Sequence, residues 1–249
     1  MIRQTIHAII PHFERLEALK SCLASLFGQR FGPGVNLGVT LVLDDSRPAL
    51  QPEILRVCGL SADPVWFQHR EGKPQWSTKF NAAVYTELPQ RKPLNFKSTT
   101  DLILICSCDF VLAPDFLTTA VRALSRLPEK ALVLAPGLNR SDEKAATRGG
   151  LVNPTTGDKE IKIHHHADNG MLWLFHARDA QTWDESYDEI GFGHQVPDWL
   201  YRMQRHGTTF WRCDELQETH IEHHDDSKDE GRAQEVERSR ILYFKNTGF

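Results

Sequence analysis

The most constraining stretch of this sequence is a run of five apolar residues at positions 102–106, followed three positions later by Asp109. An uninterrupted apolar run of this length is typical of a strand that is buried on both faces, as in a parallel sheet covered by helices. Such sheets bind their ligands beyond the carboxyl ends of the strands. We therefore expect Asp109 at the edge of a cleft, where a carboxylate can hold a hard cation against a phosphate.

Strand and helix patterns alternate along the first half of the chain. Short apolar runs predict strands at 6–10, 39–43, 65–68, 102–106 and 131–135. Apolar residues at helical spacing predict helices at 16–27, 51–58, 77–87 and 115–127, while the glycine-rich segment 28–38 predicts a loop. This alternation predicts an α/β fold with a mostly parallel, Rossmann-like central sheet and helices on both faces.

In the second half of the chain the alternation of strand and helix patterns is less regular. Residues 137–169 are polar and contain glycine, which predicts a long flexible loop. Later patterns predict a strand at 171–175, a helix at 196–206 and a strand at 208–212. Residues 225–249 are expected to form a C-terminal tail, with a charge cluster followed by a helical pattern. No repeat or linker divides the chain, so a single domain over residues 1–249 is predicted.

Composition places the chain among ordinary globular proteins. Of its 249 residues, 40% are apolar and 25% are charged, and the net charge of −4 gives no argument for a nucleic acid or an anionic membrane as partner. The five cysteines are odd in number and scattered, which does not suggest a disulfide framework. No apolar run approaches the roughly 20 residues of a membrane span. A cytoplasmic protein with at most peripheral membrane contact is predicted.

Several short motifs appear in a fixed order along the predicted strands and helices. They are IIPHFER at 9–15, VLDDS at 42–46, WSTKFNAA at 76–83, SCD at 107–109 and HIEHH at 220–224. In order and spacing they resemble the motifs of the family 2 glycosyltransferases with the GT-A fold, whose D-x-D motif matches 107–109 with the first acid replaced by Ser107. The resemblance implies a GT-A fold, with residues 1–136 as the nucleotide-binding half and 137–224 as the acceptor-side half.

The same resemblance implies a set of donor-binding residues. The residues expected to contact the nucleotide are Pro11, Phe13, Glu14, Asp44, Asp45, Lys79 and Ser107. The residues expected to bind a metal ion are Asp109, His220 and His223. A carboxylate suits Mn²⁺ or Mg²⁺, and a histidine ligand favours Mn²⁺. For Lys79, a solvated position on the helix surface is an equal alternative.

A second group of motifs lies on the acceptor side. WDESY at 183–187 resembles the family's GFDExF, and residues 191–207 align without a gap to GWGxEDxDLxxRLxxxG. In that register Gln195 and Val196 replace the acidic pair that usually supplies the general base. The catalytic candidates are therefore Asp184, Glu185, Gln195 and Asp198, and Asp188 and Glu189 are further carboxylates nearby.

Two side chains of this region have competing roles. Asp198 is also expected to pair with Arg202 four residues on, which would make it structural. Trp183 is a core candidate that could instead stack on a sugar ring.

The sequence thus predicts a metal-dependent glycosyltransferase. Hexosyl or N-acetylhexosaminyl transfer is expected from a nucleoside-diphosphate donor, with UDP-sugar favoured, to a hydroxyl of a glycan, lipid-linked sugar, protein or modified nucleic acid. Because the acidic pair is absent, three explanations stay open: another carboxylate accepts the proton, the reaction is retaining, or transfer has been lost and a nucleotide-sugar binding module remains. A nucleotidyltransferase is disfavoured, since residues 11–15 contain no glycine for a phosphate loop.

Overall fold

The computed structural model describes residues 4–12, 15–44, 52–53, 56, 63–67, 76–85, 101–134, 171–190, 195–213, 215–221 and 230–247. The strands are β1 (Gln4–His12), β2 (Val35–Asp44), β3 (Asp63–Phe67), β4 (Leu102–Cys106), β5 (Phe110–Leu112), β6 (Ala131–Leu134), β7 (Leu172–His176), β8 (Thr209–Arg212) and β9 (Glu218–His220). The helices are α1 (Leu16–Phe27), α3 (Trp76–Tyr85), α4 (Phe116–Leu124), α6 (Gln195–Arg205) and α7 (Glu230–Thr247), with 3₁₀ turns η2 (Ala177–Asp179) and η3 (Glu185–Glu189).

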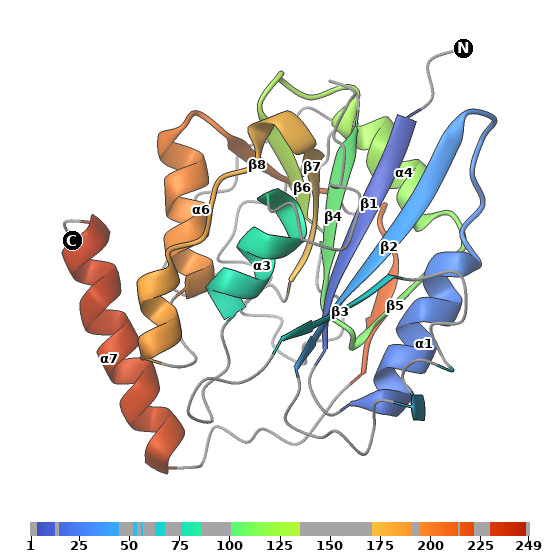
Figure 1. Ribbon diagram of the computed structural model, residues 1–249. Coiled ribbons are helices and arrows are strands. Elements are labelled where there is room, and N and C mark those ends of the chain that lie inside the picture. The colour runs from blue at the N-terminus through green and yellow to red at the C-terminus, as the bar shows by residue number, and fades with distance from the viewer. Residues whose placement is uncertain are drawn as a thin grey trace.

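Seven strands form one sheet in the order β3-β2-β1-β4-β7-β6-β8. Strands β1 to β4 and the pair β6 and β8 run parallel, and β7 is antiparallel to both of its neighbours. In Figure 1, β1, β2 and β4 run side by side, with their carboxyl ends toward the lower edge of the view. The prediction of a mostly parallel α/β sheet is confirmed, and strands from both predicted halves of the chain share this sheet.

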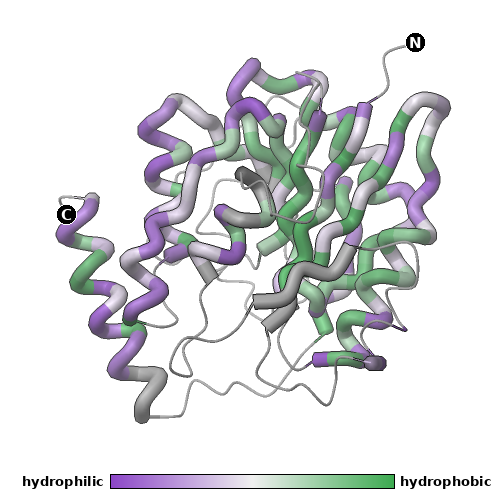
Figure 2. Tube along the Cα trace, viewed as in Figure 1, coloured by the Kyte–Doolittle hydropathy of each residue, from purple (hydrophilic) through white to green (hydrophobic). Residues whose placement is uncertain are grey.

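The sheet is buried on both faces because its strand residues alternate between two cores. Ile6, Ala8 and Ile10 pack with α1 and α4 on one face. Ile9 packs with α3 and α6 on the other, and the residues of β4 divide in the same way. The helices therefore cover both faces of the sheet (Figure 1). Figure 2 shows the hydrophobic residues concentrated along the central strands and the hydrophilic ones on the outer helices.

Two elements differ from the prediction. Strand β2 begins at Val35, within the segment predicted as a loop, because Gly34 turns the chain with a φ of 93° and the Gln4 N–H donates to its carbonyl. The helical pattern predicted near the C-terminus forms the 18-residue helix α7, which already begins at Glu230, within the predicted charge cluster, and lies along α6 (Figure 1). Tyr201 of α6 donates from its hydroxyl to the Thr247 carbonyl at 3.1 Å, which attaches the end of α7.

Other predictions fall outside the described residues. These are the loop 137–169 and most of the helix at 51–58. Strands β5 and β9, of three residues each, were not predicted, because a run that short has no recognisable period. Among the helices that the structure describes, none has both the length and the apolar content needed to cross a membrane.

Candidate active site

The carboxyl ends of β1, β2 and β4 lie together at one edge of the sheet. Pro11, near the end of β1, is buried and is in register with Val42 of β2. Asp44 is the last residue of β2, and Ser107 directly follows β4, where its N–H donates to the Met171 carbonyl at 2.6 Å. The fold thus brings three residues predicted to bind the nucleotide to the edge where open α/β sheets bind their ligands.

A small antiparallel ribbon connects this edge to a distant part of the sequence. Strand β5 follows Asp109 immediately and pairs with β9, so that Phe110 faces His220. The Ile221 N–H donates to the Asp109 carbonyl at 2.7 Å, and the Phe110 and His220 rings lie 5.0 Å apart. As a result, His220 Nε2 lies 3.4 Å from Asp109 Oδ2. Two of the three predicted metal ligands are therefore neighbours because β5 and β9 pair.

The Asp109 carboxylate is buried but surrounded by donors. The residue is 5% exposed, and Arg15 Nη1 lies 3.0 Å from its Oδ2. Burial by itself raises the pKa of Asp109, but hydrogen bonds from His220 and Ser107 and the charges of His220 and Arg15 outweigh it. The pKa of Asp109 therefore lies below its ordinary value, and the group is a carboxylate at neutral pH.

These side chains can be tested for fit to a divalent cation. Two donor atoms at right angles on one ion, each about 2.1 Å away, are about 3 Å apart. The 3.4 Å between His220 Nε2 and Asp109 Oδ2 is close to that separation. No group of three or more His, Cys, Asp or Glu gathers to hold a metal ion within the described parts of the chain, and His223 lies outside them. The described pair fits an ion whose other ligands are phosphate oxygens and water.

The remaining donor-side candidates have different outcomes. Lys79 is in the first turn of α3 and is 2% exposed, so the alternative of a solvated helix lysine is wrong. Phe13, Glu14 and Asp45 lie outside the described residues. Contact of Lys79 with a diphosphate stays a prediction.

The acceptor-side motif is held against α3 by Asp188, a candidate base in the sequence, and by Asn81. Asp188 of η3 accepts from the backbone N–H groups of Ser77 and Thr78, both at 2.8 Å, and so caps α3 from outside the helix. Asn81 pairs with the Trp183 backbone through both ends of its amide, at 2.9 and 2.7 Å. The capping role is invisible in the sequence because these partners are far apart along the chain.

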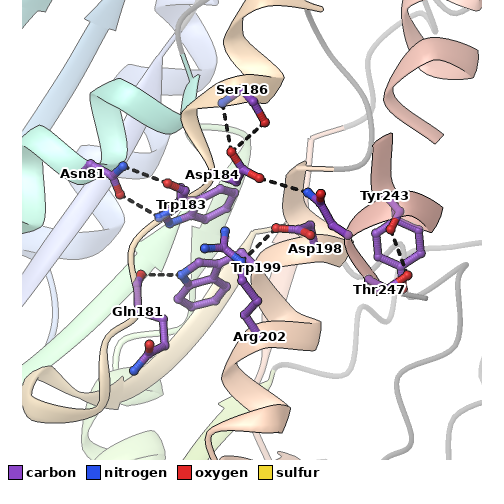
Figure 3. Close-up of polar contacts among 11 residues, drawn as sticks. Asn81, Gln181, Trp183, Asp184, Ser186, Asp198, Trp199, Arg202, Tyr243 and Thr247 are labelled. Carbon is purple, nitrogen blue, oxygen red and sulfur yellow. Dashed lines mark hydrogen bonds and ion pairs between the residues drawn. The ribbon is translucent and has the colours of Figure 1, made fainter. Parts of the chain in front are cut away.

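Asp184 begins the turn η3 and connects it to α7 (Figure 3). Its Oδ1 accepts from the Ser186 N–H at 3.0 Å and from the Ser186 hydroxyl at 2.6 Å. Its Oδ2 accepts from Asn246 Nδ2 at 2.9 Å. Burial raises the pKa of Asp184, but the hydrogen bonds from Ser186 and Asn246 and the charge of Arg202 outweigh burial. The pKa of Asp184 therefore lies below its ordinary value. A carboxylate engaged in this way is suited to hold structure.

The other catalytic candidates surround the start of α6. Asp198 is 1% exposed and accepts from Arg202 Nε at 2.9 Å, which confirms the predicted pair (Figure 3). Burial and the Asp184 charge raise the pKa of Asp198 despite this partner. Gln195 begins α6 and is 3% exposed. Glu185 is exposed, and its Oε1 accepts from Asn81 Nδ2 at 2.9 Å.

Trp183 belongs to a buried aromatic cluster. Its ring stacks on Phe80 at 4.7 Å and on Trp199 at 5.1 Å, and Trp199 stacks in turn on Trp173 at 5.4 Å. Trp183 is 4% exposed, so the hypothesis that it stacks on a sugar ring is wrong. Its role is to join α3, η3 and α6 to the sheet.

Comparisons with known proteins identify the architecture. No family model matches the sequence, and a search of curated protein sequences finds no match. A solved structure of the mannosyltransferase PcManGT from Pyrobaculum calidifontis, in complex with GDP-Man and Mn²⁺, is similar with a TM-score of 0.61 and 14% identity. The similarity covers 97% of this chain and 67% of that one. The chain has a glycosyltransferase fold of the GT-A type.

TarS from S. aureus has the same architecture. Its fragment 1–349 in complex with UDP is similar with a TM-score of 0.53 and 11% identity, over 83% of this chain. This chain spans 57% of that fragment and 36% of the longer TarS structure. At these identities the comparisons show the fold, while the roles of individual side chains depend on their geometry here.

Arg15, the last residue of the first motif, contacts the Asp109 carboxylate. The segment 9–15 contains Arg15 and carries part of the resemblance. From this segment the resemblance predicted Pro11, Phe13 and Glu14 as nucleotide contacts, but not Arg15. The structure brings its guanidinium to Asp109, 3.0 Å away. No sequence pattern pairs residues that are separated by most of the nucleotide-binding half.

Proposed function

We propose that this protein transfers a sugar from a nucleoside-diphosphate donor to a hydroxyl acceptor. The observation that carries the proposal is the Asp109 and His220 pair, with 3.4 Å between Nε2 and Oδ2, at the carboxyl edge of β4. That edge is the ligand-binding edge of open α/β sheets, and the fold is of the GT-A type. The neighbours crystallised with GDP-Man and Mn²⁺ or with UDP support a nucleotide donor.

On the donor side, the residues divide into two roles. Pro11, Asp44 and Ser107 end or follow the strands at this edge and would contact the nucleotide, together with Phe13, Glu14, Asp45 and Lys79. Asp109 and His220, with His223, would hold Mn²⁺ or Mg²⁺. When bound, the cation supplies Lewis-acid stabilisation of the departing diphosphate oxygen.

On the acceptor side, we assign the proton-accepting role to Glu185. Asp198 is paired with Arg202 and buried, Asp188 caps α3, and Asp184 caps η3. Glu185 keeps an exposed carboxylate next to these groups, and Asn81 orients it. Gln195 would bind the acceptor hydroxyl, since an amide can bind a hydroxyl but does not accept a proton at neutral pH. Asp184 would position the turn that carries Glu185 through its bonds to Ser186 and Asn246.

A binding module without transfer activity is the second candidate. It is favoured by one observation: α6 begins with Gln195 and Val196, neither of which can act as a base. The missing base does not exclude transfer activity, because a retaining transferase would need no such base.

Calorimetry with UDP and with GDP, each with and without Mn²⁺, tests the proposal. Binding of either nucleotide that strengthens with Mn²⁺ is expected, and no binding in any of the four titrations would sink it. Incubation with UDP-sugars and GDP-mannose then separates the candidates, since a transferase releases nucleoside diphosphate by slow donor hydrolysis. Nucleotide binding without any release would select the binding module.

A further inference from the structure

The ion pair between Arg15 and Asp109 leads to a further assignment, which rests on the proposed function. We infer that Arg15 is a binding residue for the donor diphosphate, and that its guanidinium is held against Asp109 until the diphosphate arrives. Arg15 immediately precedes α1, where its carbonyl accepts from the Leu19 N–H at 2.9 Å. Its backbone is therefore fixed, while its long side chain can turn toward either partner.

The exposure of the two side chains shows which one meets an incoming ligand first. The Arg15 side chain is 37% exposed, whereas that of Asp109 is 7% exposed. The guanidinium is therefore the more accessible partner of the pair. An anion from solvent can reach the Arg15 guanidinium more readily than the buried Asp109 carboxylate.

The hydrogen bonds of Arg15 leave capacity for a phosphate. Its contact with Asp109 uses Nη1, one of three nitrogens that together carry five N–H donors. Among the described residues the guanidinium has no second hydrogen bond or ion pair. A planar guanidinium with spare donors matches two phosphate oxygens at once, which a lysine ammonium cannot do.

Asp109 Oδ2 is also the oxygen that lies next to His220, and a cation held by both residues would bind there. Arg15 Nη1 and His220 Nε2 lie 3.0 and 3.4 Å from this same oxygen. A guanidinium and a divalent cation repel each other at such separations, so they compete for Oδ2. Once displaced, Arg15 requires another anion, and the diphosphate is the anion that enters with the cation. Arg15 would therefore oppose metal binding alone and favour diphosphate binding.

This assignment predicts effects of opposite sign on two ligands. In Arg15→Gln, nucleotide-free Mn²⁺ should bind about threefold more tightly, measured as free Mn²⁺ by electron paramagnetic resonance. UDP or GDP in the presence of Mn²⁺ should bind about tenfold more weakly, measured by calorimetry. Arg15→Lys keeps the charge and loses the planar fork, so it should restore wild-type Mn²⁺ affinity but only part of the diphosphate affinity.

The matched control is Arg122→Gln. It also removes one arginine from an ion pair, with Glu215 at 3.2 Å, but on the exposed surface. This variant should change neither affinity.

These measurements separate a failure of the Arg15 assignment from a failure of the proposed function. If the wild type binds a nucleotide but Arg15→Gln weakens Mn²⁺ and nucleotide together, or leaves the nucleotide affinity unchanged, Arg15 only anchors α1 and the inference is overturned while the proposed function stands. If the wild type binds neither UDP nor GDP, the proposed function fails and this inference fails with it. Circular dichroism of each variant checks that it is folded.

Discussion

Two buried aspartates, Asp109 and Asp198, each pair with an arginine, yet their surroundings differ. Asp109 follows β4, and donors from two distant parts of the chain, Arg15 and His220, lie next to its carboxylate. Asp198 lies within α6, where Arg202 of the same helix is its partner and the Asp184 charge is nearby. The pKa of Asp109 is lowered by its donors, whereas burial raises the pKa of Asp198.

The difference separates a carboxylate arranged for binding from one arranged for packing. Hydrogen bonds and the neighbouring Arg15 guanidinium lower the pKa of Asp109 and keep it a carboxylate at the edge of the sheet, where the proposed function needs one. Asp198 is enclosed between α6 and η3, so its removal should affect folding rather than binding. Four experiments test this contrast between the two aspartates.

The largest expected effect is on stability, from Asp198→Ala. Removing one partner of a buried pair leaves an uncompensated charge, and because Arg202 is 31% exposed we expect a loss of about 2 to 3 kcal/mol in unfolding free energy. Urea denaturation measures it. Asp115→Ala is the control, since that exposed aspartate makes no side-chain cap bond at the start of α4. A loss below about 1 kcal/mol would contradict the structural role.

Asp188→Ala should follow, with a loss of about 2 kcal/mol in unfolding free energy. The substitution leaves the N–H groups of Ser77 and Thr78 without their acceptors at the start of α3. Thermal or urea unfolding measures the change, and Asp188→Asn, which keeps one acceptor oxygen, should recover part of it. Equal losses in the two variants would show that charge, rather than the number of acceptors, holds α3.

For Asp109→Asn the effect should appear in binding. We expect Mn²⁺-dependent binding of UDP or GDP to weaken by about tenfold, or about 1.4 kcal/mol, because a neutral amide is a poorer ligand for a hard cation. Calorimetry with and without Mn²⁺ measures it. Unchanged Mn²⁺ dependence would remove Asp109 from the metal site and with it the contrast with Asp198.

The smallest effect is on the pH dependence of stability. The pKa of Asp198 is raised by folding, so its contribution to stability is fully present below the unfolded pKa of about 4 and is lost as the pH rises through the folded value. Asp198→Asn has no proton to lose there. The unfolding free energy of the wild type minus that of the variant should therefore fall from about pH 4 toward neutrality in urea titrations. A difference that rises with pH would mean that the charge of Arg202, rather than burial, sets the pKa of Asp198.

The elements that could be predicted from the sequence depend on local patterns. The buried strand β4, the helical spacing of α1 and α4, and the pair of Asp198 with Arg202 are all set by neighbours a few residues apart. The same patterns were not enough for Trp183, whose ring fills the core instead of facing a sugar. An aromatic side chain next to acidic residues suits either role, and only packing decides between them.

The class of fold and the position of Asp109 beyond a buried strand can be predicted from the sequence, because the apolar period and the strand ends are local properties. The groups that contact the Asp109 carboxylate depend on how distant segments pack together. The pairing of β5 with β9 brings His220 to it, and the start of α1 brings Arg15. These contacts depend on hydrogen bonds between segments with no shared periodicity. The arrangement of Arg15, Asp109 and His220 therefore exists only once the sheet, α1 and the pair of strands β5 and β9 have assembled.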